Sequence, residues 1–141
     1  MAIPPKRSRA FISFDYDHDD DLRKALLAQA KMENTPFAFE DWSIKRESKD
    51  WKEDARKRIK RCDLVIVICG HDTNRARGVS EELGIAREED VPYHLLRGRT
   101  SGTCRRPAGT SWMRDPIIKW TWPNIAVMCS GTRRPLWKIL W

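Results

Sequence analysis

The sequence lacks several features that would assign a function at once. No apolar run approaches the ~18 residues that a membrane-spanning helix needs, so we do not expect a membrane protein. A Rossmann G-x-G-x-x-G motif and a P-loop are both missing, which excludes the common glycine-rich phosphate loops. The first ten residues are basic but contain no apolar core, unlike a secretory signal. We therefore expect a cytoplasmic protein.

Cysteine is scarce and widely spaced. The chain has four cysteines, at Cys62, Cys69, Cys104 and Cys129, and no two of them form a C-x-x-C pair. This spacing argues against a structural zinc site. Because disulfides are rare in the cytoplasm, we expect all four cysteines to be reduced.

Acidic residues are almost missing from the last third of the chain. Residues 96–141 contain nine Lys/Arg and one acid, Asp115, whereas residues 1–95 contain 18 Lys/Arg and 19 Asp/Glu. The net charge of +7 therefore comes from the C-terminal third. Such a field attracts nucleic acid or small anions, and a solvated basic tail is an equally good interpretation. Since we find no known nucleic-acid-binding motif, we do not expect a nucleic-acid partner.

Strand and helix patterns alternate over the first two thirds of the chain. The apolar runs typical of strands lie at residues 9–14, 37–39, 62–70 and 92–96. Segments with apolar residues at helical spacing lie between them, at residues 22–32, 51–61 and 79–89. The run at 62–70 is β-branched and nearly continuous, as in strands buried on both faces. The order predicts an α/β fold, with an open parallel sheet covered by helices on both faces.

The length of 141 residues is that of one ordinary domain. We expect a basic N-terminal extension over residues 1–8, the domain over 9–130, and a basic, tryptophan-containing tail over 131–141. Residues 97–116 have the composition of a loop. The segment TWPNIAVMCSG that follows fits either a short helix, with Pro123 in its first turn, or a last strand.

Five acids stand within seven residues in the stretch FISFDYDHDDD, residues 11–21. Asp19, Asp20 and Asp21 precede a predicted helix, and we expect them to cap it because acids stabilise a helix N-terminus. Familiar acidic sites fit poorly. A haloacid-dehalogenase site needs a later acidic pair that is missing, and a response-regulator receiver needs an aspartate where Cys69 and Gly70 stand. An EF-hand loop needs a glycine and a glutamate that this segment lacks.

Candidate binding residues follow three of the predicted strands. Asp15 and Tyr16 follow the first strand, Trp42 follows the second, and His71 follows the third. Ligands of open parallel sheets bind beyond the carboxyl ends of the strands. We therefore expect these groups to meet at one pocket. Packing over the neighbouring helix explains Trp42 equally well, and an ordinary loop position is the alternative for His71.

Several segments resemble one family in the same order along the chain. They are RAFISFDYDHDDDLRKAL, DW with DWKEDARKRIKRCDLVIVICG, GVSEELGIAREEDVPYHLL and KWTWPN. FISF looks like the first signature box of TIR domains, and EDWSIKRESKD stands where TIR domains carry their BB loop. The likeness is closest to the TIR-like proteins of bacterial Thoeris anti-phage systems, the ThsB-like group. It covers about residues 8–126 and implies a flavodoxin-like fold of TIR type.

The resemblance implies an enzyme that consumes NAD as substrate, with no cofactor and no metal. Gly78-Val79-Ser80-Glu81-Glu82-Leu83 matches the frame around the catalytic glutamate of TIR domains, which assigns that role to Glu82; Gly78 replaces a frequent tryptophan. Asp15 and Tyr16 would line the pocket mouth, and Phe14 or Trp42 would stack on a ring of the substrate. In the Thoeris group the ADP-ribose product is cyclised into a signal that a separate effector receives. Self-association and a phage-derived trigger are also implied.

Another interpretation remains open from the sequence. Glu82 is also compatible with an ordinary exposed helix acid, paired with a neighbour such as Arg75. In that case the chain would be a non-catalytic TIR-like scaffold that acts by self-association or partner binding. Turnover of NAD distinguishes this scaffold from the enzyme.

Overall fold

Strands and helices alternate along the computed structural model, which describes residues 7–43 and 49–130. In chain order the elements are β1 (Arg7–Ser13), α1 (Asp20–Ala30), β2 (Ala38–Asp41), α2 (Trp51–Lys60), β3 (Leu64–Cys69), the 3-10 turn η1 (Thr73–Arg75), α3 (Arg77–Glu88), β4 (Tyr93–Arg97), β5 (Ile117–Ile118) and α4 (Trp122–Cys129). The predictions for residues 1–6, for 131–141 and for the centre of the expected BB loop, residues 44–48, lie outside the described residues.

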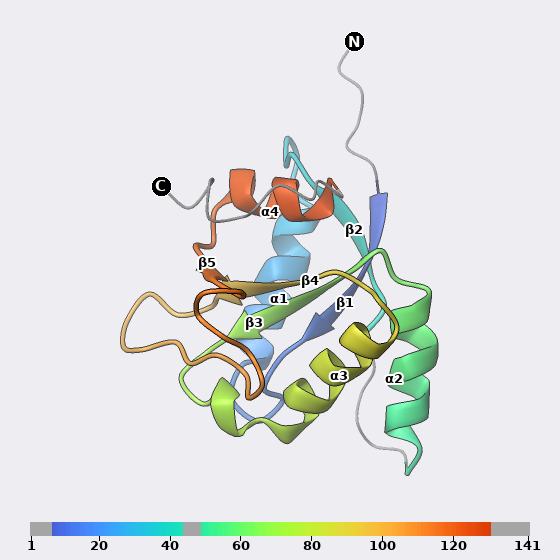
Figure 1. Ribbon diagram of the computed structural model, residues 1–141. Helices are drawn as coiled ribbons and strands as arrows, with labels where there is room; N and C mark the ends of the chain where they lie inside the picture. The colour runs from blue at the N-terminus through green and yellow to red at the C-terminus, as the bar shows by residue number, and fades with distance from the viewer. Residues whose placement is uncertain (1–6, 44–48, 131–141) are drawn as a thin grey trace.

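The sheet has five parallel strands in the order β2-β1-β3-β4-β5. In its centre Ile66 of β3 pairs in register with Ile12 of β1 and with His94 of β4. This strand order is that of flavodoxin-like folds. The predicted open parallel sheet is confirmed, and Figure 1 shows helices in front of it and behind it.

Alternation along β3 divides the core into two layers. Leu64, Ile66 and Ile68 pack in one apolar cluster, together with residues of α1 and α4. The intervening side chains of β3 pack in a second cluster, together with residues of α2 and α3. Every residue of β3 is buried, as expected for a central strand covered on both faces. Helices α1 and α4 therefore cover one face of the sheet, and α2 and α3 cover the other (Figure 1).

Sequence patterns missed one strand and left one helix undecided. The strand β5 has two residues, too few to show a period, and it forms by pairing with Leu95 and Leu96 of β4. The helical alternative for the segment after it is confirmed by α4, which has a proline in its first turn. At its start the Thr121 hydroxyl accepts a hydrogen bond from the backbone N–H of Asn124, a regular N-cap.

The four cysteines are free and buried. Burial raises the pKa of Cys62, Cys69 and Cys129 to about 12. Such thiols carry almost no thiolate at neutral pH. The cysteines therefore act as small apolar residues of the core.

Candidate active site

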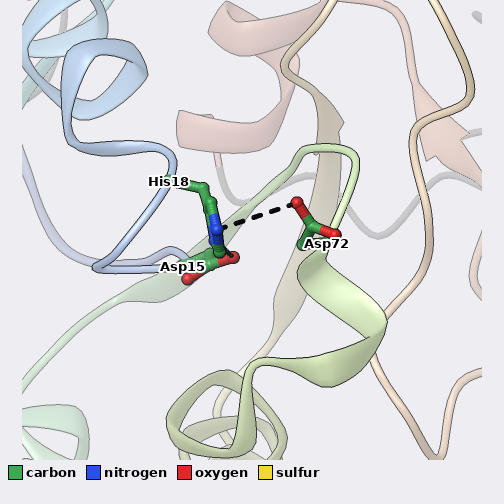
Figure 2. A group of neighbouring side chains, drawn as sticks. All are labelled: Asp15, His18 and Asp72. Carbon is green, nitrogen blue, oxygen red and sulfur yellow. Dashed lines mark hydrogen bonds and ion pairs between the residues drawn. The ribbon is translucent and has the colours of Figure 1, made fainter.

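Polar side chains gather where the strands β1 and β3 end. The loop after β1 carries Asp15 and His18, and the loop after β3 carries His71 and Asp72. Figure 2 shows His18 reaching from the first loop toward Asp72 on the second. Because parallel strands end at the same edge, the sequence correctly placed these two loops together.

Glu82 lies at the same edge, on the inner face of α3. Its side chain is directed at the end of β1, where the Ser13 hydroxyl donates a 2.7 Å hydrogen bond to the Glu82 carboxylate. Glu82 is only 3% exposed and Ser13 is fully buried. The interpretation of Glu82 as an ordinary exposed helix acid is therefore wrong. A carboxylate is costly to bury unless it is hydrogen-bonded, so this contact helps to keep it inside.

The neighbouring acid, Glu81, has the opposite environment. One residue along α3 turns a side chain by about 100°, which places Glu81 at the surface between α2 and α3. There it forms ion pairs with Lys52 at 2.9 Å and with Arg77 at 3.5 Å. These two cations, Lys52 first, hold the pKa of Glu81 below its usual range. The two glutamates differ in surroundings although they share a helix turn.

Asp15, His18 and Asp72 form a small charged group. The His18 ring contacts Asp15 through Nδ1 at 2.7 Å, and its Nε2 lies 3.9 Å from Asp72. The hydrogen bond and charge of Asp15 are the main causes that raise the pKa of His18. One ligand atom of each residue lies within 4.8 Å of the other two, a spacing that a metal ion can bridge.

The rest of the acidic stretch is held by an arginine that the sequence did not point to. Arg99, from the loop after β4, binds Asp19 at 3.0 Å and Asp21 at 2.8 Å. Asp19 stands at the N-cap of α1 but its side chain makes no capping hydrogen bond, so the expected cap is wrong for that residue. Asp20 and Asp21 do lie in the first turn of α1. Burial raises the pKa of Asp19, and the Arg99 guanidinium opposes that effect.

The other predicted binding residues lie on different sides of the sheet. Phe14 is buried, stacks on Tyr16 at a ring distance of 5.5 Å, and belongs to the core under α1. Trp42 is half-buried against the opposite layer, with Arg9 over its ring at 5.7 Å. His71 is exposed, and its Nε2 lies 2.6 Å from the Ser101 carbonyl oxygen. Phe14 and Trp42 thus face opposite layers, and their roles in binding stay predictions.

An open hollow of about 310 Å³ lies beside this edge. It is lined by His71, Asp72, Arg75, Gly102, Thr103 and Arg105. Of these, only His71 was a candidate from sequence. The loop of residues 97–116 carried no periodic signal, and its approach to β3 depends on tertiary contacts.

Comparison with known proteins identifies the family. Among the described residues, no helix has the length and apolar character that crossing a membrane requires. A search of curated proteins found no match. The family model described as Thoeris protein ThsB, TIR-like domain, matches residues 11–96, which span β1 to β4 and include Glu82, and this is more than half of the chain. The chain therefore belongs to the TIR-like family of Thoeris protein ThsB, and this membership supports a role in anti-phage defence.

Proposed function

We propose that this protein cleaves NAD at the bond between nicotinamide and ribose, with Glu82 as the catalytic carboxylate. When that bond breaks, its electron pair goes to the nicotinamide nitrogen, so nicotinamide leaves as a neutral molecule without a general acid. Positive charge develops on the ribose carbon, and a nearby carboxylate stabilises it. The carbon is then captured by water, which releases a proton and gives ADP-ribose, or by a nitrogen of the adenine, which closes a ring.

The observation that carries this proposal is the placement of Glu82. Glu82 is 3% exposed, and its carboxylate is held by Ser13 at the carboxyl edge of the sheet, the edge at which ligands bind in such folds. A charge in a low-dielectric position acts on a developing cation more strongly than one in water. The match to the Thoeris family, which includes this residue, supports the same assignment.

The burial of Glu82 also bears on how substrate arrives. A side chain that is 3% exposed has almost no contact with solvent, so neighbouring groups must move before NAD reaches the carboxylate. We propose that self-association of the chain, or a phage-derived trigger, produces that movement. The product would be a cyclic ADP-ribose-type signal for a separate effector in the cytoplasm. No cofactor, metal or nucleic-acid partner enters this proposal.

The decisive experiment incubates the purified protein with NAD at low and high protein concentration and identifies the products by mass spectrometry. Glu82→Gln removes the charge but keeps the shape, and we expect it to lower nicotinamide release by roughly a hundredfold or more. Glu81→Gln is the matched control, because that acid lies at the surface, and it should leave release nearly unchanged. Equal activity in the Glu82→Gln protein would refute the assignment.

A non-catalytic scaffold is the second candidate, favoured by one observation. Trp112 and Met113 stand side by side in the loop before β5 and are 73% and 77% exposed. Adjacent exposed apolar side chains are a frequent mark of a protein contact. If this surface mediates self-association, Trp112→Ala and Met113→Ala together should shift the protein toward monomer in sedimentation velocity. A scaffold would show that shift without any release of nicotinamide by the parent protein.

A further inference from the structure

We propose that the hollow lined by His71, Asp72, Arg75, Gly102, Thr103 and Arg105 is a phosphate-binding site. We infer that its ligand is the pyrophosphate of NAD, an assignment that rests on the proposed function. The volume, about 310 Å³, is at the lower limit of ligand pockets. It therefore suits one part of a dinucleotide rather than the whole molecule.

The walls of the hollow are fixed to the sheet by backbone contacts. The N–H of Arg105 donates to the Gly70 carbonyl at 2.9 Å, and the N–H of Gly98 donates to the Cys69 carbonyl at 2.8 Å. These bonds hold the loop after β4 against the end of β3. The site is thus formed by two loops joined at the sheet edge, which reduces the ordering cost of binding.

A contact between His71 and the opposite loop closes the hollow further. Its Nε2 lies 2.6 Å from the Ser101 carbonyl oxygen, and a carbonyl only accepts, so that nitrogen carries a proton. Gly102 has a φ of +70°, and a Cβ there would lie 2.8 Å from His71 Nε2. The positive φ favours glycine at this position, and the His71 ring lies close against it.

The charges of the lining favour an anion. Arg75 and Arg105 are exposed, and neither guanidinium pairs with a carboxylate of the described residues. In contrast, Arg99 nearby is occupied by Asp19 and Asp21. The hollow has a single acid, Asp72, which faces the ring of His18 at 3.9 Å. Arginine binds phosphate oxygens in a two-pronged manner, and the Thr103 hydroxyl adds a further donor.

The position of the hollow relates it to Glu82. Arg75 belongs to η1, which is followed directly by α3, the helix that carries Glu82. The hollow lies beside the loops after β3 and β4, Glu82 contacts the end of β1, and η1 contacts α3. If the ribose of a dinucleotide approaches Glu82, its negatively charged pyrophosphate lies at the same edge of the sheet. There Arg75 and Arg105 can bind it.

The test measures binding by calorimetry in the Glu82→Gln protein, so that NAD is not consumed. The probes are NAD, ADP and inorganic pyrophosphate, with adenosine as a ligand that lacks phosphate. The double variant Arg75→Ala/Arg105→Ala should weaken binding of all three phosphate compounds by roughly tenfold or more. Adenosine binding should not change between the two proteins. Arg61→Ala is the control, because this exposed cation follows α2 and stands at the other end of the sheet.

The outcomes separate the site from the enzyme activity. If pyrophosphate does not bind, or binds equally well to the double variant, the phosphate site is refuted. If the parent protein cleaves NAD but the double variant has the same KM, the activity stands and this subsite fails. If pyrophosphate binds through the two arginines while NAD is never cleaved, the phosphate site stands and the proposed function fails. Binding of ADP and pyrophosphate without NAD would assign the site to another phosphate compound.

Discussion

Two regions of this molecule use the same charged residue types in opposite ways. At the carboxyl edge of the sheet, the acids Asp15, Asp19 and Glu82 are buried. Between α2 and α3, the charged side chains line an open groove of about 530 Å³ and pair with one another at the surface. Lys52 with Glu81 and Arg56 with Glu88 and Glu89 are the pairs of this second region.

The difference separates function from ordinary surface charge. A buried carboxylate loses its hydration and persists only with dedicated partners, as Glu82 does with Ser13 and Asp19 does with Arg99. An exposed ion pair contributes little to stability, because water solvates both charges and screens their attraction. The free-energy cost of burying charge is therefore concentrated at the edge where a ligand would bind. Sequence patterns do not show which charges are buried, since both regions are rich in charged residues.

Replacing Arg99 should lower the unfolding free energy more than any change in the exposed region, because Arg99 is the partner of a buried acid. Arg99→Met leaves Asp19, whose side chain is 2% exposed, without its cation, and we expect a loss of about 3 kcal/mol of unfolding free energy. Because Arg99 opposes the burial that raises the pKa of Asp19, its loss raises that pKa further. The deficit should therefore grow as pH rises. Urea unfolding at several pH values measures it.

Two companion variants make the Arg99 test specific. Asp19→Asn combined with Arg99→Met removes the buried charge as well and should recover much of the stability. Asp21→Asn removes the exposed acid that binds the same guanidinium and should lower the stability much less, because water screens that ion pair. If Asp21→Asn lowered the unfolding free energy as much as Arg99→Met does, burial would not be what distinguishes Asp19 from Asp21.

His94 should make the interior sensitive to acid. Burial lowers the pKa of this β4 residue to about 4, from an ordinary value of 6.5, and its Nδ1 has no hydrogen-bond partner within the described part of the chain. The neutral ring is favoured in the folded state, so stability is present above pH 6.5 and is lost as pH falls toward 4. The shift corresponds to about 3 kcal/mol. Unfolding of the parent and of His94→Gln across this range tests it, because the variant should lack this component.

Asp15→Asn should change the titration of His18 with little effect on the fold. Asp15 is the main cause of the raised pKa of His18, so the variant should bring that pKa down toward 6.5. The stabilisation from the protonated ring is present below pH 6.5 and is lost as pH rises through the folded-state pKa. Nuclear magnetic resonance of the imidazole protons follows the titration. Asp17→Asn is the control, since Asp17 is the last of the charges that act on His18.

The smallest effect is expected in the exposed region. Arg56→Gln removes the contacts to Glu88 and Glu89, and the unfolding free energy should fall only slightly, because exposed ion pairs contribute little. The loss should shrink further in high salt, because exposed charges are screened. Urea titrations at two salt concentrations measure both quantities. A loss as large as that of Arg99→Met would contradict the contrast between the two regions.

Much of the fold followed from local pattern. The β-branched run of β3, the apolar spacing of α2 and the strand–helix order predicted the parallel sheet, and the structure confirms it. The strand β5 was missed because two residues show no period, and it depends on β4 for its hydrogen bonds. The choice between helix and strand for α4 likewise needed the packing of Ile125 and Met128 on the core.

The candidate site was only partly visible in the sequence. The resemblance to TIR domains singled out Glu82, and the ends of the strands placed Asp15 and His71 at one edge. The burial of Glu82 against Ser13, and the binding of Asp19 by Arg99, join residues 69 and 80 positions apart in the chain. No local pattern encodes such contacts.

The sequence by itself determined the α/β order, the membership in the Thoeris family and the position of the candidate acid. These depend on periodicity and short motifs, which are properties of neighbouring residues. Tertiary structure alone decided which acids are buried, which arginines pair with them and which stay available to a ligand. The reason is that the energy of a charge depends on its distance from solvent and from other charges, and both are set only when the chain has folded.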